Sequence, residues 1–519
     1  MLTFIFTWWF LALAGILLLL VIVFIYDVFL QKTHTILHNF PVVGHFRYWI
    51  ESIGPELRQY IVANNREELP FNRSQRSWIY ASSKKENNYE GFGSDKDFNS
   101  PNYIIIKPAM FPFKVEHMHV NYKQKSFLPS AKIIGAKRKK PFRPKSIVNV
   151  SAMSFGSLSA AAVDALNKGS LKAGNYHNTG EGGLSPYHSN GADVCFHFGT
   201  GYFGVRNMED GTFSMEKMKQ LIIDNPFIKK IEVKLSQGAK PGKGGVLPGK
   251  KITQQISEIR GVEMGKDVLS PSTHSAFNNI DSLIDFVEEI AAETGLPVGI
   301  KSAVGQLAYW RELAQKMKAT GKGPDFITID GGEGGTGAAP PAFADHVSMP
   351  FIYAFPKVYK VFQENQIADK VVWIGSGKLG LPDRAAMAFA MGVDVINVAR
   401  EAMLSIGCIQ AQLCHTNNCP TGVATQKKWL QKGLDIPLKA NRFYNYVNAI
   451  NKELLEITHA CGYEHPCQLK MKDIEIAMGD NNKTISLKAS YQYEKEEVPF
   501  NGMKELKDCA YLGGNKHSS

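Results

Sequence analysis

The sequence lacks the features that mark several classes of protein. It has only seven cysteines in 519 residues, an odd number that does not describe a secreted scaffold held by disulfides. It contains no zinc finger, RNP motif or long basic helix, so its net charge of +11 does not indicate nucleic-acid binding. Its mean hydropathy of −0.17 argues against a polytopic membrane protein. With 44% hydrophobic and 21% charged residues, extended disorder is also excluded.

One long hydrophobic run stands near the N-terminus. From Phe4 to Tyr26 the chain carries no charged residue, and at about 1.5 Å per residue such a helix spans roughly 34 Å. A cleaved signal peptide, the alternative, needs basic residues before the run, and no Lys or Arg precedes Phe4. We therefore expect a retained transmembrane anchor at residues 1–28. The nearest basic residues, Lys32 and Arg47, follow the run, which places the large C-terminal part in the cytoplasm.

Three further regions are expected beyond the anchor. Residues 29–130 form an accessory segment in which short apolar runs alternate with polar stretches. The main domain spans residues 131–470 and opens with a basic stretch, Lys132 to Lys145, which holds seven basic residues and two prolines. We interpret that stretch as a solvated linker rather than a patch that contacts anionic lipid. Residues 471–519 form a polar, lysine-rich C-terminal tail.

A short apolar run, a turn rich in Gly, Ser or Asn, and a helical stretch follow one another repeatedly beyond residue 145. The predicted strands are Ile147–Met153, Gly174–Asn178, Val194–Phe198, Lys230–Leu235, Val298–Ser302, Phe326–Asp330, Val371–Ile374 and Val393–Val398. The predicted helices are Ala160–Lys172, Ser214–Asp224, Asp281–Glu293, Ala308–Lys318, Val358–Gln363 and Asp383–Met391. Eight strands, each followed by a helix, predict an α/β fold, the (β/α)8 or TIM barrel. The stretch Ser236–Asn279 is too long for a plain connection, and long loops on such barrels usually carry function.

Glycines and polar residues follow most of the predicted strands, at the barrel end where active sites lie. Repeated glycine turns at one end indicate backbone packed closely around a flat, phosphorylated ligand. Two stretches match G-x-G-x-x-G, but neither leads directly into a helix, which argues against a dinucleotide site. We expect a phosphate site at the seventh and eighth strand ends, near Gly375 and Gly377, with charge from Lys378 or Arg400. Tight turns alone are the alternative.

Three cysteines, Cys408, Cys414 and Cys419, are spaced Cys-x5-Cys-x4-Cys. Thiolates this close in sequence can ligate one Fe–S cluster, and three ligands suit a 3Fe-4S cluster. The spacing alone leaves two alternatives open, buried structural cysteines and a zinc site that uses His415. The remaining cysteines show no metal-binding spacing.

Five motifs together resemble the FMN and synthase region of glutamate synthases. They are Ser151-Ala-Met-Ser-Phe-Gly-Ser157, Asn178-Thr-Gly-Glu-Gly-Gly183, Gln237-Gly-Ala-Lys-Pro-Gly242, Glu333-Gly-Gly-Thr-Gly-Ala338 and Cys419-Pro-Thr-Gly-Val-Ala-Thr-Gln426. The N-terminal segments Pro41-Val-Val-Gly-His-Phe-Arg47 and Pro70-Phe-Asn-Arg73 are similar to stand-alone, membrane-anchored proteins of this type. The resemblance runs from these segments to about residue 470 and leaves out the tail.

The resemblance implies a barrel that binds FMN and a 3Fe-4S cluster on Cys408, Cys414 and Cys419. Electrons would pass from the cluster to FMN, which would deliver a hydride to 2-iminoglutarate, formed from 2-oxoglutarate and ammonia. The implied cofactor-binding residues are Ser151, Ala152, Met153, Ser154, Lys234, Lys301, Asp330, Gly331, Gly332, Gly334, Gly335, Thr336, Gly375, Ser376, Gly377, Lys378, Ala399 and Arg400.

The implied catalytic residues are Glu181, which would act on the imine proton, and Lys301, which would stabilise the reduced flavin. Lys234 and Lys240 also suit a dicarboxylate substrate, with Gln237 as an orienting donor and Arg260 as a carboxylate ligand. Each has a plainer alternative. Lys301 would otherwise extend to solvent, Glu181 would be a solvated loop carboxylate, and Arg260 an ordinary helix-end arginine.

Several positions depart from the family's pattern. A hydrophobic run stands where glutamate synthases carry a glutaminase domain, so ammonia or an amine must come from elsewhere. Lys243 and Val246 occupy positions that are usually Glu and Gln, and Ser272-Thr-His-Ser275 replaces Pro-Pro-His-His. The substrate can therefore be another 2-oxo acid. The electron donor would be reduced ferredoxin or a reductase subunit. Two other hypotheses stay open: an electron-relay protein without synthase activity, and an FMN-dependent dehydrogenase or isomerase without a cluster.

Overall fold

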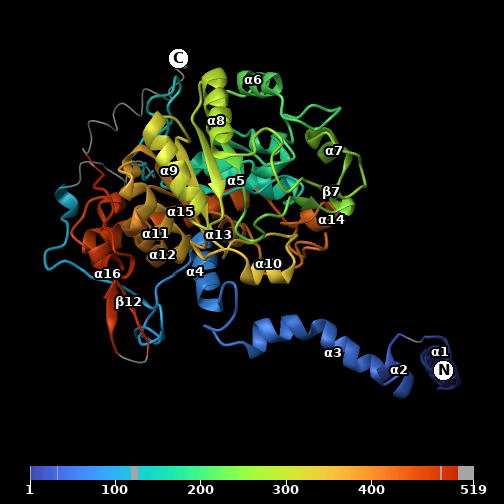
Figure 1. The fold of residues 1–519 in the computed structure, drawn as a ribbon. Helices are drawn as coiled ribbons and strands as arrows, with labels where there is room; N and C mark the ends of the chain where they lie inside the picture. Colours follow the sequence, from blue (N-terminus) through green and yellow to red (C-terminus); the bar gives the residue numbers. More distant parts are fainter. Residues whose placement is uncertain (1, 32, 118–126, 480–481, 499, 501–519) are drawn as a thin grey trace, which may run out of the picture. The chain divides into compact units, whose positions relative to one another are not determined.

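The computed structural model describes residues 2–31, 33–117, 127–479, 482–498 and 500. The chain divides into two compact units, Met1–Ser74 and Gln75–Ser519, which are described separately (Figure 1).

The first unit is helical. It begins with α1 (Leu2–Ile25), which continues through a π-helical turn at Tyr26–Leu30, and goes on with α2 (Thr35–Asn39) and α3 (Gly44–Leu57). Among the described residues, Trp8–Leu30 is the one stretch of helix long and apolar enough to cross a membrane, with a mean hydropathy of 2.9. Membrane anchors and signal sequences share that length and composition.

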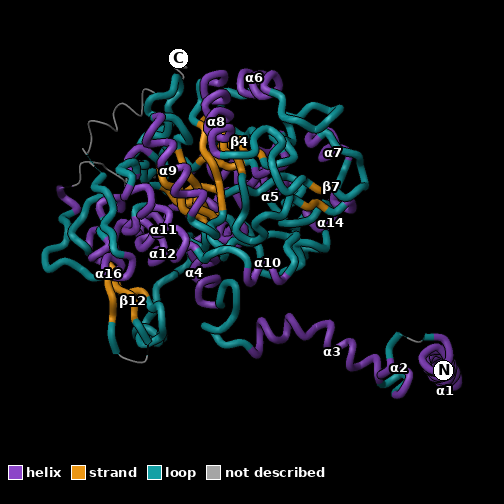
Figure 2. Tube along the Cα trace, in the orientation of Figure 1, coloured by secondary structure: helices purple, strands orange, loops and turns teal. Residues whose placement is uncertain are grey.

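The second unit is built around a closed barrel of eight strands, all parallel, inside a layer of helices (Figure 2). The strands are β2 (Val148–Val150), β3 (Tyr176–Asn178), β4 (Asp193–Phe198), β5 (Ile228–Lys234), β8 (Val298–Ser302), β9 (Phe326–Asp330), β10 (Val372–Ser376) and β11 (Val395–Val398). The barrel closes where β11 pairs with β2, with Asn397 opposite Asn149. The predicted barrel and its eight strands are confirmed.

The predicted helices also form, as α5 (Ala160–Ala173), α6 (Met215–Asp224), α8 (Ile280–Thr294), α9 (Ala308–Thr320), α11 (Phe351–Glu364) and α12 (Pro382–Met391). Helix α11 begins seven residues before the predicted start, because Pro356 removes only one backbone N–H and does not end the helix. The expectation of a helix after every strand is wrong at β3. The glycine-rich connection there forms two 3₁₀ turns, Gly180–Gly182 and Pro186–His188, before β4 begins.

The long stretch after β5 has its own structure. It contains a two-stranded antiparallel sheet of β6 (Val246–Leu247) and β7 (Val268–Leu269), and the helix α7 (Gln254–Arg260). Its first turn reaches the end of β9, where the backbone N–H of Gly238 donates to Asp330 Oδ2 at 2.9 Å. The stretch therefore folds over the C-terminal ends of the barrel strands, as its length predicts.

The basic stretch at 132–145 is not a solvated linker, and this expectation was wrong. The guanidinium of Arg138 makes paired hydrogen bonds to Glu288, at 2.6 and 2.9 Å, and to Asp325, both at 2.9 Å. Ile134 is fully buried with the inward side chains of the barrel's N-terminal end. The carboxylates that neutralise this stretch come from distant parts of the chain.

Residues beyond 470 also pack on this unit. Strand β12 (Ile474–Ala477) pairs with β1 (Ile104–Ile106) on one side and β13 (Thr484–Ser486) on the other. Further on, the hydroxyl of Tyr493 donates to the carbonyl of Met391 at 2.8 Å. The tail region is thus joined to the barrel at least as far as this tyrosine.

Candidate active site

The ends of β8, β9 and β10 are held together by one carboxylate. Asp330 accepts hydrogen bonds from the hydroxyl of Ser376, at 2.8 Å, and from the N–H of Gly238. The amine of Lys301 lies 3.5 Å from the same carboxylate. Lys301 and Asp330 are both buried, so this cation is held at the top of the barrel rather than extended to solvent.

A second ion pair lies across the barrel mouth. The amine of Lys234, at the end of β5, donates to Glu181 Oε2 at 2.8 Å and to Gln237 Oε1 at 3.1 Å. Burial alone would raise the pKa of Glu181, but the attraction and hydrogen bond of Lys234 lower it to about 2. Glu181 is therefore ionised at neutral pH, which suits it to bind a cation or an N–H donor and not to donate a proton.

Two glycines allow this carboxylate to sit where it does. A Cβ atom on Gly199 would lie 2.8 Å from one oxygen of Glu181, and a Cβ on Gly245 would lie 2.7 Å from the other. Any larger residue at either position would displace the carboxylate. The glycine after β4 and the glycine in the long loop are thus both needed for the pair.

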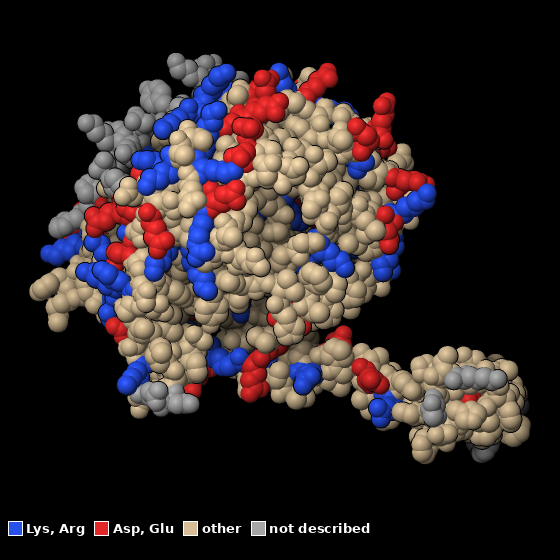
Figure 3. Space-filling model, viewed as in Figure 1, with Lys and Arg blue, Asp and Glu red and all other residues tan. Residues whose placement is uncertain are grey.

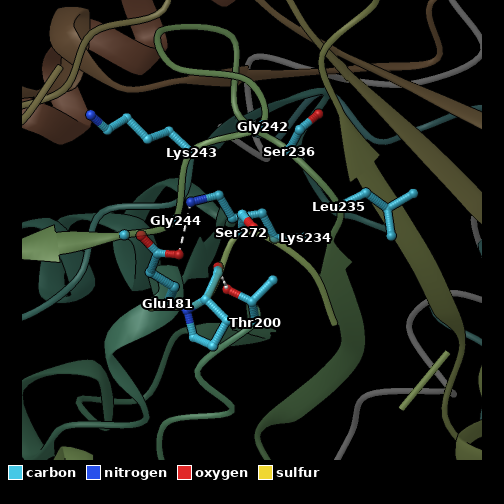
Figure 4. A pocket seen from close by; sticks show the side chains of 11 residues that line it. Glu181, Thr200, Lys234, Leu235, Ser236, Gly242, Lys243, Gly244 and Ser272 are labelled. Carbon is cyan, nitrogen blue, oxygen red and sulfur yellow. Dashed lines mark hydrogen bonds and ion pairs between the residues drawn. The ribbon is translucent and has the colours of Figure 1, made fainter. Parts of the chain in front are cut away.

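The Lys234–Glu181 pair borders a pocket that encloses about 280 Å³ of empty space, open solvent included (Figure 4). Its other lining residues are Thr200, Leu235, Ser236, Gly242, Lys243, Gly244, Gly245, Pro271 and Ser272. In Figure 4 the amine of Lys243 points away from the pair. The polar lining suits a small charged molecule.

The predicted substrate residues take different positions. Lys240 is buried, and its amine donates to the carbonyl of Gly244 at 3.1 Å, so it shapes the loop that borders the pocket. Burial lowers the pKa of Lys240, although the nearby Glu181 offsets part of this effect. Gln237 lies in the same loop, and its amide oxygen accepts from Lys234 at 3.1 Å.

Arg260 lies beneath the loops and does not line the pocket. Its guanidinium donates to Ser154 Oγ at 3.2 Å and to the carbonyl of Phe155 at 3.1 Å. A Cβ on Gly182 would come within 2.7 Å of it, so it is enclosed by the loops after β2 and β3. Burial lowers its pKa to about 10. Arg260 supports these loops from below.

The segment that departs from the family's pattern has a defined structural role through His274. The ring Nε2 donates to the carbonyl of Lys234 at 2.8 Å, and Nδ1 accepts from the hydroxyl of Tyr202 at 3.0 Å. The Lys234 carbonyl can only accept, so the ring proton is on Nε2 and Nδ1 is the acceptor. The Tyr202 hydroxyl accepts in turn from the backbone N–H of Ser275. Burial lowers the pKa of His274 to about 4, so the ring is neutral and locks the loop to the end of β5.

Cations gather at the ends of β10 and β11, where the phosphate site is predicted. Burial and then the neighbouring Arg384 and Arg400 lower the pKa of Lys378 to about 8. Glu333 is turned away to cap α11, where both its oxygens accept from the N–H of Phe351, at 2.8 and 3.0 Å. A phosphate dianion would stabilise the charge of Lys378, which burial and the two arginines disfavour. These residues therefore fit the phosphate of FMN.

The remaining predicted cofactor residues surround the same end of the barrel. Ser151 N–H donates to the carbonyl of Val398 at 2.8 Å, which places the turn after β2 beside the end of β11. The side chain of Arg400 donates to the carbonyl of Glu333, which joins the loop after β9 to the start of α13 (Arg400–Ser405). The other members of the predicted set belong to these loops or to the end of β10 and the residue after it: Ala152, Met153, Ser154, Gly331, Gly332, Gly334, Gly335, Thr336, Gly375, Ser376, Gly377 and Ala399.

The three clustered cysteines lie in the loop after α13. The amine of Lys251 donates to the carbonyls of Cys414, at 2.8 Å, and Ala424, at 3.1 Å, which joins the long loop after β5 to the cysteine loop. Burial, together with the nearby thiols of Cys414 and Cys419, raises the pKa of the Cys408 thiol to about 12. The donor chemistry thus fits an Fe–S cluster, although within the described ranges no three His, Cys, Asp or Glu side chains are grouped as a metal site.

A charged layer inside the barrel was not expected from the sequence. Glu232, fully buried, accepts from His197 Nδ1 at 2.7 Å, from Asn178 at 2.7 Å and from Thr328 at 2.6 Å. The amine of Lys230, two residues earlier on β5, lies between the rings of Tyr176 and Phe326, at 4.3 and 3.9 Å. The alternation Lys230, Glu232, Lys234, with the apolar Ile231 and Val233 between them, was the signal available.

A family model described as "Conserved region in glutamate synthase" matches residues 103–464. The chain belongs to the glutamate synthase family. It is 41% identical to the glutamate synthase large subunit-like protein YerD of Bacillus subtilis (strain 168), over 87% of this chain and 91% of that protein. The resemblance drawn from the five motifs is confirmed, and the chain is a glutamate synthase-type oxidoreductase.

Other members of the glutamate synthase family are longer than the region they share with this chain. The archaeal-type glutamate synthase [NADPH] of Thermotoga sp. (strain RQ2) is 34% identical over 61% of this chain and 59% of its own length. The ferredoxin-dependent glutamate synthase of Pyropia yezoensis is 30% identical, over only 21% of its length. Among solved structures, a variant of mandelate oxidase with 2-hydroxy-phenylacetamide aligns with a TM-score of 0.40 and 13% identity, over 78% of this chain and 90% of that one.

Proposed function

We propose that this chain reduces the 2-imino acid formed from a 2-oxo acid and ammonia or an amine, with 2-iminoglutarate as the first substrate to test. The observation that carries the proposal is the Lys234–Glu181 pair on the wall of a polar pocket, at the barrel end where the predicted cofactor loops meet. Glu181 binds the N–H of the imine or amine, and Lys234 holds the carboxylate in place. Glu181 does not donate a proton, because its carboxylate is ionised at neutral pH.

FMN is the proposed cofactor, and when bound it supplies the hydride. Lys378, Arg384 and Arg400 hold its phosphate, which removes the mutual repulsion among these cations. Lys301 provides a buried positive charge at the centre of the barrel mouth, where it stabilises negative charge on a reduced ring system. Asp330 fixes the position of the Lys301 amine.

A 3Fe-4S cluster on Cys408, Cys414 and Cys419 is the proposed route for electrons. Three thiols from one loop, anchored through Lys251 to the loop that borders the pocket, support it. Reduced ferredoxin or a separate reductase subunit would supply the electrons. The α1 helix is proposed to anchor the protein in a membrane because of its length and hydropathy, and Lys32 and Arg47 after it favour a barrel in the cytoplasm.

Flavin reoxidation tests the proposal. The purified full chain in detergent is photoreduced without oxygen and mixed with 2-oxoglutarate and ammonium. The expected result is rapid return of the oxidised flavin spectrum only when both compounds are present. A flavin that stays reduced with 2-oxoglutarate, glyoxylate and pyruvate, each tested with ammonium and methylamine, would overturn the proposal and favour an electron-relay protein.

A further inference from the structure

The first unit carries an apolar surface that its own packing leaves uncovered. Helix α3 presents Phe46, 61% exposed, and Trp49, 58% exposed, with their rings stacked at 5.8 Å between centroids. Ile50 and Leu57 lie on the same side and are also exposed. Exposed apolar side chains that gather on one side of a helix mark a surface for contact with a membrane or another protein.

These side chains form one continuous stripe. At 100° per residue, Phe46, Trp49, Ile50, Ile53 and Leu57 fall within an arc of about 100°. Arg47 and Glu51 lie about 60° and 100° beyond one edge of this arc, and Glu56 lies about 20° beyond the other edge, beside Trp49. An apolar stripe bordered by charged residues is typical of a helix that lies in a membrane interface.

A network centred on Asp27 fixes how α3 leaves the end of α1. The Asp27 carboxylate, completely buried, accepts from the backbone N–H of Val42 at 2.9 Å and pairs with His45 Nε2 at 2.9 Å. Gln31 Nε2 donates to the Asp27 carbonyl at 3.0 Å and to the His34 carbonyl at 3.1 Å. The connection between the two helices is therefore a built turn and not a free linker.

The turn sets α3 across the axis of α1. Figure 1 views α1 end-on, while α3 runs across the view. If α1 crosses a bilayer, the network holds α3 along the bilayer surface. Tryptophan is the side chain most suited to that depth, because its ring is apolar while its N–H stays at the wet headgroups.

We propose that α3 lies in the membrane interface, with Phe46, Trp49 and Ile50 inserted among the lipid chains. The inference rests on the proposed anchor, because the turn at Asp27 transmits the orientation of α1 to α3. The occupant of the apolar stripe is the lipid surface. In Figure 3 the end of the first unit that contains α1 shows almost no Lys, Arg, Asp or Glu, in keeping with one membrane-bound unit.

Fluorescence quenching in the full chain tests this. The protein is reconstituted in phosphatidylcholine vesicles, with and without phosphatidylcholine brominated near the middle of its chains, and compared with the variant Trp49→Phe. The chain has seven tryptophans. Trp8 and Trp9 lie at the start of the apolar span, and only they and Trp49 are expected to reach lipid. Trp49→Phe then removes about one third of the lipid-quenched emission. The control Trp429→Phe, at an exposed position of the second unit, removes none.

The outcomes separate the two proposals. If wild type is quenched and Trp49→Phe leaves the quenched emission unchanged, the placement of α3 is wrong and the anchor stands. If no emission is quenched, the anchor fails and the inference fails with it. If Trp49 is shielded from both brominated lipid and iodide in water, a protein surface or a second copy covers the stripe, and the lipid assignment is overturned.

Discussion

Lys234 Nζ and Glu181 Oε2 lie 2.8 Å apart at the mouth of the barrel, one from the end of β5 and the other from the turn after β3. The pair is the main cause of the ionised state of Glu181, because Lys234, with smaller contributions from His197 and Lys240, offsets the effect of burial on the carboxylate. A group with a lowered pKa contributes stability above its unfolded pKa and loses it as pH falls towards its folded value. The stabilising effect of the pair therefore persists at neutral pH and disappears between about pH 4.5 and 2.

Removing the lysine should make Glu181 titrate in the working range. In Lys234→Met the buried carboxylate loses its hydrogen-bonded cation and keeps only the weaker attraction of Lys240 and His197, so its pKa rises. We expect kcat/KM to fall about 10- to 100-fold at pH 7 and an acidic limb to appear between pH 5 and 7 in its pH profile. Lys234→Arg keeps the charge and should show no such limb. An acidic limb identical in Lys234→Met and wild type would contradict the role of the pair.

FMN affinity should depend on pH through Lys378. Its pKa is lowered to about 8, so the free protein loses this charge as pH rises above 8, and binding the phosphate restores it. We expect FMN to bind about tenfold more weakly at pH 10 than at pH 7, with proton uptake on binding at pH 9. Calorimetry in two buffers of different ionisation enthalpy measures that uptake. In Lys378→Met the uptake should vanish; uptake that persists there belongs to another group.

Iron content tests the cysteine loop. Cys414→Ser should lower the iron and acid-labile sulfide of the purified protein several-fold, because three thiolates are the fewest that hold a 3Fe-4S cluster. Cys461→Ser, at another buried cysteine distant in sequence from the loop, should leave both unchanged. Wild-type protein purified without oxygen that holds no iron would rule the cluster out.

The buried carboxylate of Glu232 should matter for stability. Its pKa is held well below the usual range because His197 donates to it, although burial opposes this. Removing one partner of such a buried pair costs about 3–5 kcal/mol, so Glu232→Leu should lower the free energy of unfolding by that order. Urea denaturation measures it. The exposed Glu289→Gln is the matched control, and equal effects of the two changes would show that the network adds nothing.

The barrel could be predicted because its evidence is periodic. Short apolar runs such as Phe326–Asp330 recur with helices between them, and each strand can be recognised from its own residues without knowing which strands lie beside it. The cation cluster was predicted in part, since Lys378 and Arg400 both follow strands whose ends meet in a barrel. Arg384, in the first turn of α12, carries no such signal.

Other features depend on contacts that a sequence does not display. The basic stretch gave no sign that Glu288 and Asp325 would meet Arg138 from two other elements. Arg260 stands at a helix end, but only the glycines at 156 and 182 let its guanidinium pass under the loops. The segment Ser272-Thr-His-Ser275 departs from the family's pattern in sequence, and only the structure shows that its His274 joins the loop to the end of β5.

The most direct test of the account is product analysis with labelled nitrogen. The full chain, reduced without oxygen and supplied with 2-oxoglutarate and ¹⁵N-ammonium, should form ¹⁵N-glutamate, one molecule for each two electrons consumed. Lys301→Met should form it at least tenfold more slowly, and omission of ammonium should abolish it. Reduced protein that consumes no electrons and yields no labelled amino acid, with 2-oxoglutarate or any other 2-oxo acid, would contradict the claim that this barrel reduces an imino acid.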